Sequence, residues 1–175
     1  VTKGELNISV NVFGYPFKKP IPRSGAKLGD SIYVTGQLGK AKQGLNDWLN
    51  KKDSIYCNDY LRPKPQFQKA KEISGFATSC IDISDGLIKD LGDICKQSNV
   101  GAELCYENIP ILYDQKDLTH GDDYQLCFTA PSHLDDQLRS QGFFFIGKII
   151  QNLDLIVKKD GSEVTFVKNG WDPFE

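Results

Sequence analysis

The 175-residue sequence contains no methionine, two histidines, two tryptophans and no C-x-x-C pair among its five cysteines. No apolar run approaches the roughly 18 residues of a membrane-spanning helix, and no signal peptide opens the chain. Lysine and arginine (21) nearly balance aspartate and glutamate (23), which gives a net charge of −2. These absences argue against a membrane protein, a zinc site, and nucleic-acid binding through a basic face.

The cysteines indicate the cellular compartment of the protein, and the first residues indicate whether the sequence is a fragment. Cys80, Cys95 and Cys127 lie in apolar runs, as small core residues of a reduced cytoplasmic protein do. Because the sequence has no initiator methionine and begins directly with an alternating apolar segment, we expect it to be a fragment of a longer protein. The chain is long enough to bury a proper core, most simply as one domain.

Periodicity predicts strands mixed with helices. Residues 14–23 carry three prolines and indicate a linker, and the conflicting signals of residues 50–65 leave a loop or a short helix open. Lys159-Asp160-Gly161 indicates a hairpin turn. This order favours an α+β fold, a layered α/β/α domain with a mixed sheet. The expected helices are 38–49, 66–74, one that begins near Ser84, and 132–139; the expected strands are 6–12, 31–36, 77–83, 102–106, 124–129, 143–150, 153–158 and 163–167.

The most informative segment is 82–86, where a buried strand leads into an amphipathic helix. Ser84 suits the N-cap, Asp85 falls in the first turn, and Asp82 lies at the end of the strand. Free N–H groups at a helix start favour anions, and carboxylates hold magnesium, which binds phosphate oxygens. The segment therefore suggests a nucleotide–magnesium site. The alternative is a capped helix in which Asp85 only balances the helix dipole.

Four segments in one order, 23–30, 81–87, 121–126 and 170–171, are together similar to the C-terminal part of thiamine-monophosphate kinases. Those enzymes belong to the superfamily of aminoimidazole ribonucleotide synthetase and selenophosphate synthetase. The resemblance implies transfer of the ATP γ-phosphoryl group to thiamine phosphate, which gives thiamine diphosphate. It further implies ATP as co-substrate, Mg²⁺, K⁺ as a further candidate ion, and a homodimer at full length.

The resemblance also implies roles for single residues. Asp82 and Asp85 correspond to magnesium ligands, and Arg23 and Ser84 to contacts with the nucleotide. Asp122 and Trp171 correspond to substrate contacts, and an aromatic face suits a cationic thiazolium ring. Each of these residues also has a purely structural alternative. Arg23 would be a surface charge, Asp122 would lie in a solvated turn, and Trp171 would pack as part of the C-terminal segment.

Three positions depart from the family pattern. His120 replaces a glycine, Asp122 replaces a glutamate and Gln125 replaces a later acid. The resemblance implies that residues 1–22 are a terminal strand and linker from a missing N-terminal domain, and that residues 23–175 form the C-terminal ATP- and substrate-binding domain. That missing domain would supply further acidic metal ligands, so we expect the isolated fragment to be inactive.

Catalysis by such a protein requires positioning and charge neutralisation rather than a nucleophile. We assign no catalytic residue, because no Ser-His-Asp set or activated cysteine is evident. Two other functions stay open: another ATP-dependent synthetase of the same superfamily, and a non-catalytic binding or assembly module.

Overall fold

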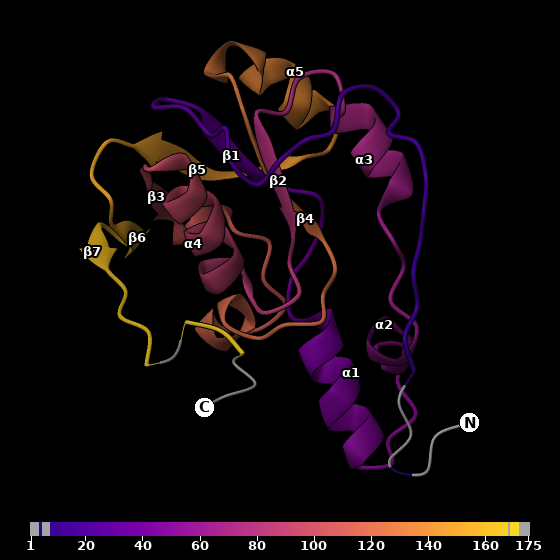
Figure 1. Ribbon diagram of the computed structural model, residues 1–175. Coiled ribbons are helices and arrows are strands. Elements are labelled where there is room, and N and C mark those ends of the chain that lie inside the picture. Colours follow the sequence, from indigo (N-terminus) through magenta and orange to yellow (C-terminus); the bar gives the residue numbers. More distant parts are fainter. Residues whose placement is uncertain (1–3, 5–7, 168, 172–175) are drawn as a thin grey trace.

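The computed structural model describes residue 4, residues 8–167 and residues 169–171. Its centre is a seven-stranded sheet in the order β2-β4-β1-β5-β3-β6-β7 (Figure 1). All neighbouring strands pair antiparallel except β3 and β6, which run parallel. The sheet is therefore mixed. The strands are β1 (Ser31–Val34), β2 (Ser79–Asp82), β3 (Gly101–Cys105), β4 (Leu126–Ala130), β5 (Phe144–Ile150), β6 (Leu155–Lys159) and β7 (Ser162–Glu163).

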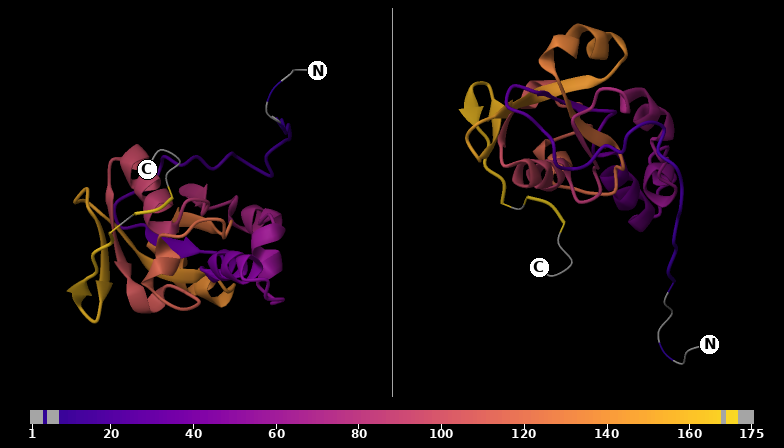
Figure 2. Two further views of the ribbon diagram at one scale, coloured as in Figure 1. Left: turned by 90° about the horizontal axis from the view of Figure 1, so that it is seen from below. Right: turned by 45° about the horizontal axis from the view of Figure 1, so that its top comes forward.

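Helices cover both faces of the sheet (Figures 1 and 2). None of the helices in the described ranges has both the length and the apolar character that crossing a membrane requires. The helices are α1 (Lys40–Leu49), α2 (Cys57–Leu61), α3 (Phe67–Ile73), α4 (Leu87–Ser98) and α5 (Asp135–Ser140), with 3₁₀ turns η1 (Tyr106–Asn108), η2 (Gln115–Leu118) and η3 (Ser132–Leu134).

Two apolar cores lie on opposite faces of the sheet. Leu87, Leu91 and Ile94 of α4 are fully buried in the larger core, against residues of β1 to β6. The smaller core joins Ile73 of α3 and Leu138 of α5 to aromatic rings of the central strands. Strands β1, β2, β4 and β5 contribute side chains to both cores, which explains why β1 is buried along its whole length. The layered α/β/α arrangement confirms the predicted fold class.

Most expected elements are present, with shifts of a few residues at their ends. The segment 50–65 contains the short helix α2, and the expected hairpin exists as β6 and β7. Two local expectations are wrong. The expected helix 132–139 begins as the 3₁₀ turn η3 at Ser132, and α5 starts only at Asp135. The last strand is shorter than predicted: β7 spans Ser162 and Glu163, and Val164 adds one backbone hydrogen bond to Val157 of β6 at 2.8 Å.

The expected strand 6–12 is also wrong where it can be followed. Residues 5–7 lie outside the described part, and Ile8 to Val12 form no strand. No backbone hydrogen bond joins the described residues 8–17 to the rest of the described chain. The segment extends away from the body in both views of Figure 2, and Val10 is 80% exposed and Phe13 94%. Alternating apolar residues form a strand only beside a partner strand, and none of the described strands lies beside this segment.

Phe128 is the side chain on which the smaller core is built, so we expect Phe128→Ala to destabilise the fold by about 3–5 kcal/mol. The residue is fully buried, its ring centroid is 5.3 Å from that of Tyr33, and the edge contact with Phe143 has a centroid distance of 5.2 Å. Urea unfolding followed by circular dichroism measures the loss. Leu153→Ala, at a side chain that is 64% exposed, is the control; equal losses for both variants would contradict this description of the core.

Candidate active site

The loop that follows strand β2 and the loop that precedes strand β4 are joined by backbone hydrogen bonds. Ile83 donates its N–H to Gln125 (2.7 Å), Tyr124 donates to Ile83 (2.9 Å) and Asp122 donates to Ser84 (2.9 Å). These bonds continue the antiparallel pairing of the two strands beyond their last paired residues, Asp82 and Leu126. Segments 82–86 and 121–125, which are far apart in the sequence, are therefore held side by side at one end of the sheet.

Two glycines permit this close approach. A Cβ atom at Gly121 would lie 2.0 Å from the Ser84 carbonyl oxygen, and one at Gly86 would lie 2.8 Å from the Thr119 carbonyl carbon. Gly86 also has φ 123°, a conformation that side chains rarely adopt. Any larger residue at either position would push the loops apart.

The start of α4 is organised by Asp90 rather than by Ser84. One oxygen of the Asp90 carboxylate accepts the backbone N–H groups of Ser84, Asp85 and Gly86 at 3.0, 3.0 and 3.1 Å. The helix begins after Gly86, and no side chain caps it from that position. The prediction of Ser84 as N-cap, with free N–H groups beside it, is wrong because an acid in the first turn satisfies those groups. Burial raises the pKa of Asp90 to about 6, against the effect of these bonds.

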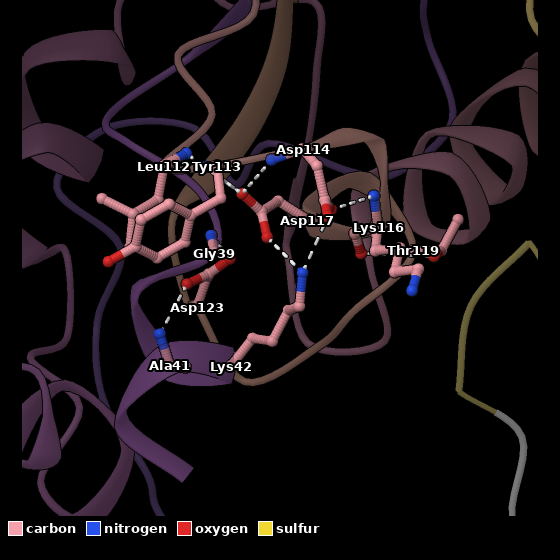
Figure 3. Close-up of polar contacts among 10 residues, drawn as sticks. All are labelled: Gly39, Ala41, Lys42, Leu112, Tyr113, Asp114, Lys116, Asp117, Thr119 and Asp123. Atoms are coloured by element: carbon pink, nitrogen blue, oxygen red, sulfur yellow. Dashed lines mark hydrogen bonds and ion pairs between the residues drawn. The ribbon is translucent and has the colours of Figure 1, made fainter. Parts of the chain in front are cut away.

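A second carboxylate joins the loop 121–125 to helix α1. Asp123 accepts the N–H groups of Gly39 (2.7 Å) and Ala41 (3.1 Å) at the start of that helix (Figure 3). Burial raises the pKa of Asp123 to about 6, although these N–H bonds favour the charged form. This contact fixes both the helix and the loop that carries Asp122.

A third carboxylate, Asp117, holds the neighbouring loop in the same way. It accepts the N–H groups of Leu112, Tyr113 and Asp114 and forms an ion pair with Lys42 of α1 at 2.7 Å (Figure 3). Its side chain is fully buried, whereas that of Lys42 is a quarter exposed. Helix α1 is thus tied to two loops that border the site.

The C-terminal segment returns to the start of α4. Trp171 donates its backbone N–H to the carbonyl of Asp85 (2.9 Å), and its own carbonyl accepts a bond from the Lys89 ammonium. Lys89 also pairs with the Asp85 carboxylate at 3.0 Å. The Trp171 side chain is 60% exposed, so its ring is open to a ligand.

These elements enclose a cavity of about 660 Å³, large enough for a small molecule. Four of the residues singled out in the sequence line it together: Ser84, Asp85, Asp122 and Trp171. Asp82 does not line it, although it lies only two residues before Ser84 at the end of β2.

Arg23 also lies outside the cavity, beside the outer edge of β2. The preceding Pro22 accepts the N–H of Cys80 at 3.0 Å, and Arg23 itself is exposed. Strand residues rise about 3.3 Å each, so Asp82 lies about 7 Å further along the strand than Cys80. An arginine side chain at this point faces solvent near the strand that leads to the site.

Sequence reasoning missed several cavity residues. Leu45 and Tyr60 come from α1 and α2, and no motif marks either position or Thr119. His120 and Tyr124, which lie in or next to the motif 121–126 but were given no role, also line the cavity. Burial, and then the nearby Lys42 cation, lower the pKa of His120, with Asp122 and Asp117 acting in the opposite direction. The imidazole is therefore neutral at neutral pH.

The side chains near the cavity could supply only some of the ligands that Mg²⁺ requires. Within the described ranges, no group of three or more histidine, cysteine or acidic side chains is arranged to hold a metal ion. Mg²⁺ is commonly held by one or two carboxylates while phosphate oxygens and water complete its shell. The two carboxylates predicted to be such ligands are Asp82, at the end of β2, and Asp85, which lines the cavity and is paired with Lys89 at 3.0 Å.

Comparisons with known proteins identify homologues of this chain. No protein-family model matches the chain. Thiamine-monophosphate kinase of Escherichia coli O157:H7 is 36% identical over 199 aligned residues, which cover 99% of this chain and 61% of that protein. The chain is a homologue of the thiamine-monophosphate kinases. The predicted resemblance is thereby confirmed, over less than two thirds of the relative's length.

Solved structures agree with this relationship. The structure of AaThiL in complex with AMPPCP and TMP has a TM-score of 0.75 and 30% identity, over 88% of this chain and 54% of that one. Thiamine-monophosphate kinase of Stenotrophomonas maltophilia K279a has a TM-score of 0.72 and 30% identity, over 81% of this chain and 54% of that one. These homologues share the predicted fold of the aminoimidazole ribonucleotide synthetase type.

The raised pKa of Asp123 predicts a pH dependence of stability. Because its folded pKa of about 6 lies above the ordinary value of 3.8, ionisation is harder in the folded than in the unfolded chain. Its contribution to the free energy of unfolding is therefore fully present below about pH 4 and is lost as the pH rises through about 6. Asp123→Asn should flatten this slope and, by losing one backbone bond, destabilise the protein by about 1 kcal/mol.

Urea unfolding at a series of pH values between about 4 and about 8 measures both effects. Asp136→Asn on α5, at an exposed acid, removes the same charge and should keep the wild-type slope. A wild-type slope in Asp123→Asn would show that Asp123 does not titrate in this range.

Proposed function

We propose that residues 23–175 form the C-terminal, ATP- and substrate-binding domain of an enzyme that transfers the γ-phosphoryl group of ATP to thiamine phosphate. The product would be thiamine diphosphate. The supporting observation is the convergence of Ser84, Asp85, Asp122 and Trp171 on one cavity, in a chain whose homologue AaThiL has been solved with AMPPCP and TMP. In this proposal residues 1–22 belong with an N-terminal domain, as a linker and a terminal segment that would form a strand only beside a partner strand of that domain.

The nucleotide would lie at the ends of β2 and α4. Asp82 and Asp85 would hold Mg²⁺, which when bound neutralises phosphate charge and orients the phosphate oxygens. The Ser84 hydroxyl can donate to a phosphate oxygen, and the exposed Arg23 can reach along the edge of β2 with its planar guanidinium. The backbone N–H groups of 84–86 are occupied by Asp90 and are not offered to the nucleotide.

The acceptor would lie between Trp171 and Asp122. The open face of the Trp171 ring attracts a cation such as the thiazolium of thiamine phosphate. Asp122 adds a negative charge to the same cavity, whereas the neutral His120 adds no repelling positive charge. The acceptor phosphate is itself a nucleophile, so we assign no general base and no covalent intermediate.

The same proposal extends to partners and location. K⁺ is a further candidate ion beside Mg²⁺, the full-length protein would be a homodimer, and the enzyme would work in the cytoplasm. The metal site would be completed by acidic ligands from another domain, because Mg²⁺ needs more ligands than the two carboxylates of Asp82 and Asp85 and the described residues hold no group of three or more candidate ligands.

The full-length protein should therefore phosphorylate thiamine phosphate with ATP and Mg²⁺, whereas the isolated 175 residues should turn over at least about 100-fold more slowly, because positioning and charge neutralisation supply most of the acceleration. A coupled assay for ADP, with thiamine diphosphate identified by chromatography, measures both rates.

Three outcomes, two from this assay and one from calorimetry, would remove parts of the proposal. Turnover only with a different acceptor would assign the chain to another ATP-dependent synthetase of the superfamily, and calorimetry without any ATP–Mg²⁺ heat would indicate an assembly module. Full-rate turnover by the isolated chain would contradict the partial metal site.

Trp171→Ala should raise the KM for thiamine phosphate about tenfold while kcat changes little. The reason is that a cation above an aromatic face contributes about 1–2 kcal/mol to binding, and remote ring contacts act on both the ground and the transition state. Steady-state kinetics with varied thiamine phosphate at saturating ATP provide the measurement. Phe67→Ala, which removes an exposed aromatic ring on α3 outside the cavity, is the matched control. An unchanged KM in Trp171→Ala would place the ring outside the substrate site.

A further inference from the structure

The Asp90 side chain occupies a position that phosphate groups occupy in many nucleotide-binding proteins. Successive backbone N–H groups at the start of a helix form a ready anion site. Here the N–H groups of Ser84, Asp85 and Gly86 all point to one oxygen of Asp90, at 3.0–3.1 Å. Asp90 is 3% exposed, so this carboxylate closes the anion site from inside the protein.

The charge balance at this end of α4 is therefore unfavourable for a free phosphate. The partial positive charge of a helix start is about half an elementary charge, and the Asp90 carboxylate more than cancels it. Asp82 and Asp85 add two further acidic groups at the same end, and Lys89, paired with Asp85 at 3.0 Å, offsets one of them. A polyphosphate without a cation meets net negative charge here, whereas a divalent cation reverses the sign.

We propose that Asp90 is a positioning residue that makes this site selective for the metal complex of a nucleotide over the free nucleotide. Its carboxylate sets the path of the 84–86 backbone, from which Ser84 and Asp85 enter the cavity, and it denies those N–H groups to a bare phosphate. The inference depends on the proposed function only in that a nucleotide binds beside Asp82 and Asp85.

The test is the ratio of ATP affinities with Mg²⁺ and with EDTA, measured by calorimetry at pH 8 on the full-length protein. Asp90→Asn keeps an oxygen acceptor but removes the charge, so ATP without metal should bind more tightly. The ratio should fall about thirtyfold, as expected for two unit charges about 8 Å apart at an effective dielectric constant near 20. Asp93→Asn, one turn further along α4, removes an equal charge but accepts none of the three bonds. It should leave the ratio within about threefold of wild type.

An unchanged ratio in Asp90→Asn, or an equal fall in Asp93→Asn, would overturn the inference. If circular dichroism shows that Asp90→Asn does not fold, the inference is tested on the wild-type protein by measuring the binding of inorganic tripolyphosphate with Mg²⁺ and with EDTA. Binding of tripolyphosphate in EDTA as tight as with Mg²⁺ overturns the inference. If the full-length protein phosphorylates thiamine phosphate but Asp90→Asn leaves the ratio of ATP affinities unaltered, only the inference about Asp90 is refuted. If Asp90→Asn lowers that ratio but the protein does not phosphorylate thiamine phosphate, only the proposed kinase activity is refuted.

Discussion

Buried and half-buried carboxylates that accept clusters of backbone N–H groups are the interaction on which the site depends. Asp90 holds residues 84–86, Asp117 holds residues 112–114, and Asp123 holds the start of α1. Loops without regular structure would otherwise bury unpaired N–H groups, each at a cost of about 1–3 kcal/mol. Each of these acids therefore replaces a missing strand or helix partner, and together they give the cavity defined walls.

The fold was largely predictable because its elements have simple periodicity. In the helix that begins at Leu87, apolar residues recur at the spacing of a helix with one buried face. Strands β4 and β5 are short apolar runs between turn residues. The order of the strands in the sheet was not predictable, because pairing between β1 and β5 joins segments more than a hundred residues apart. The expected strand at 6–12 failed for the same reason: alternation indicates a buried face but not the partner that buries it.

The site was predictable only in part. Ser84, Asp85, Asp122 and Trp171 were marked by motifs, and they line one cavity. Asp90 could have been recognised as an acid in the first helical turn, where its carboxylate reaches the preceding N–H groups. Tyr60 carries no such signal, because its place beside the cavity results from the packing of α2 on α1.

The extended segment 8–17 has a consequence for work with this chain in solution. Its backbone N–H and C=O groups are unpaired within the described chain, and Ile8, Val10 and Val12 expose their side chains in an alternating row. Such a row is a template to which another extended polypeptide can add through backbone hydrogen bonds. Concentrated preparations should therefore self-associate through this segment, and lysine or proline within it would suppress that association without touching either core.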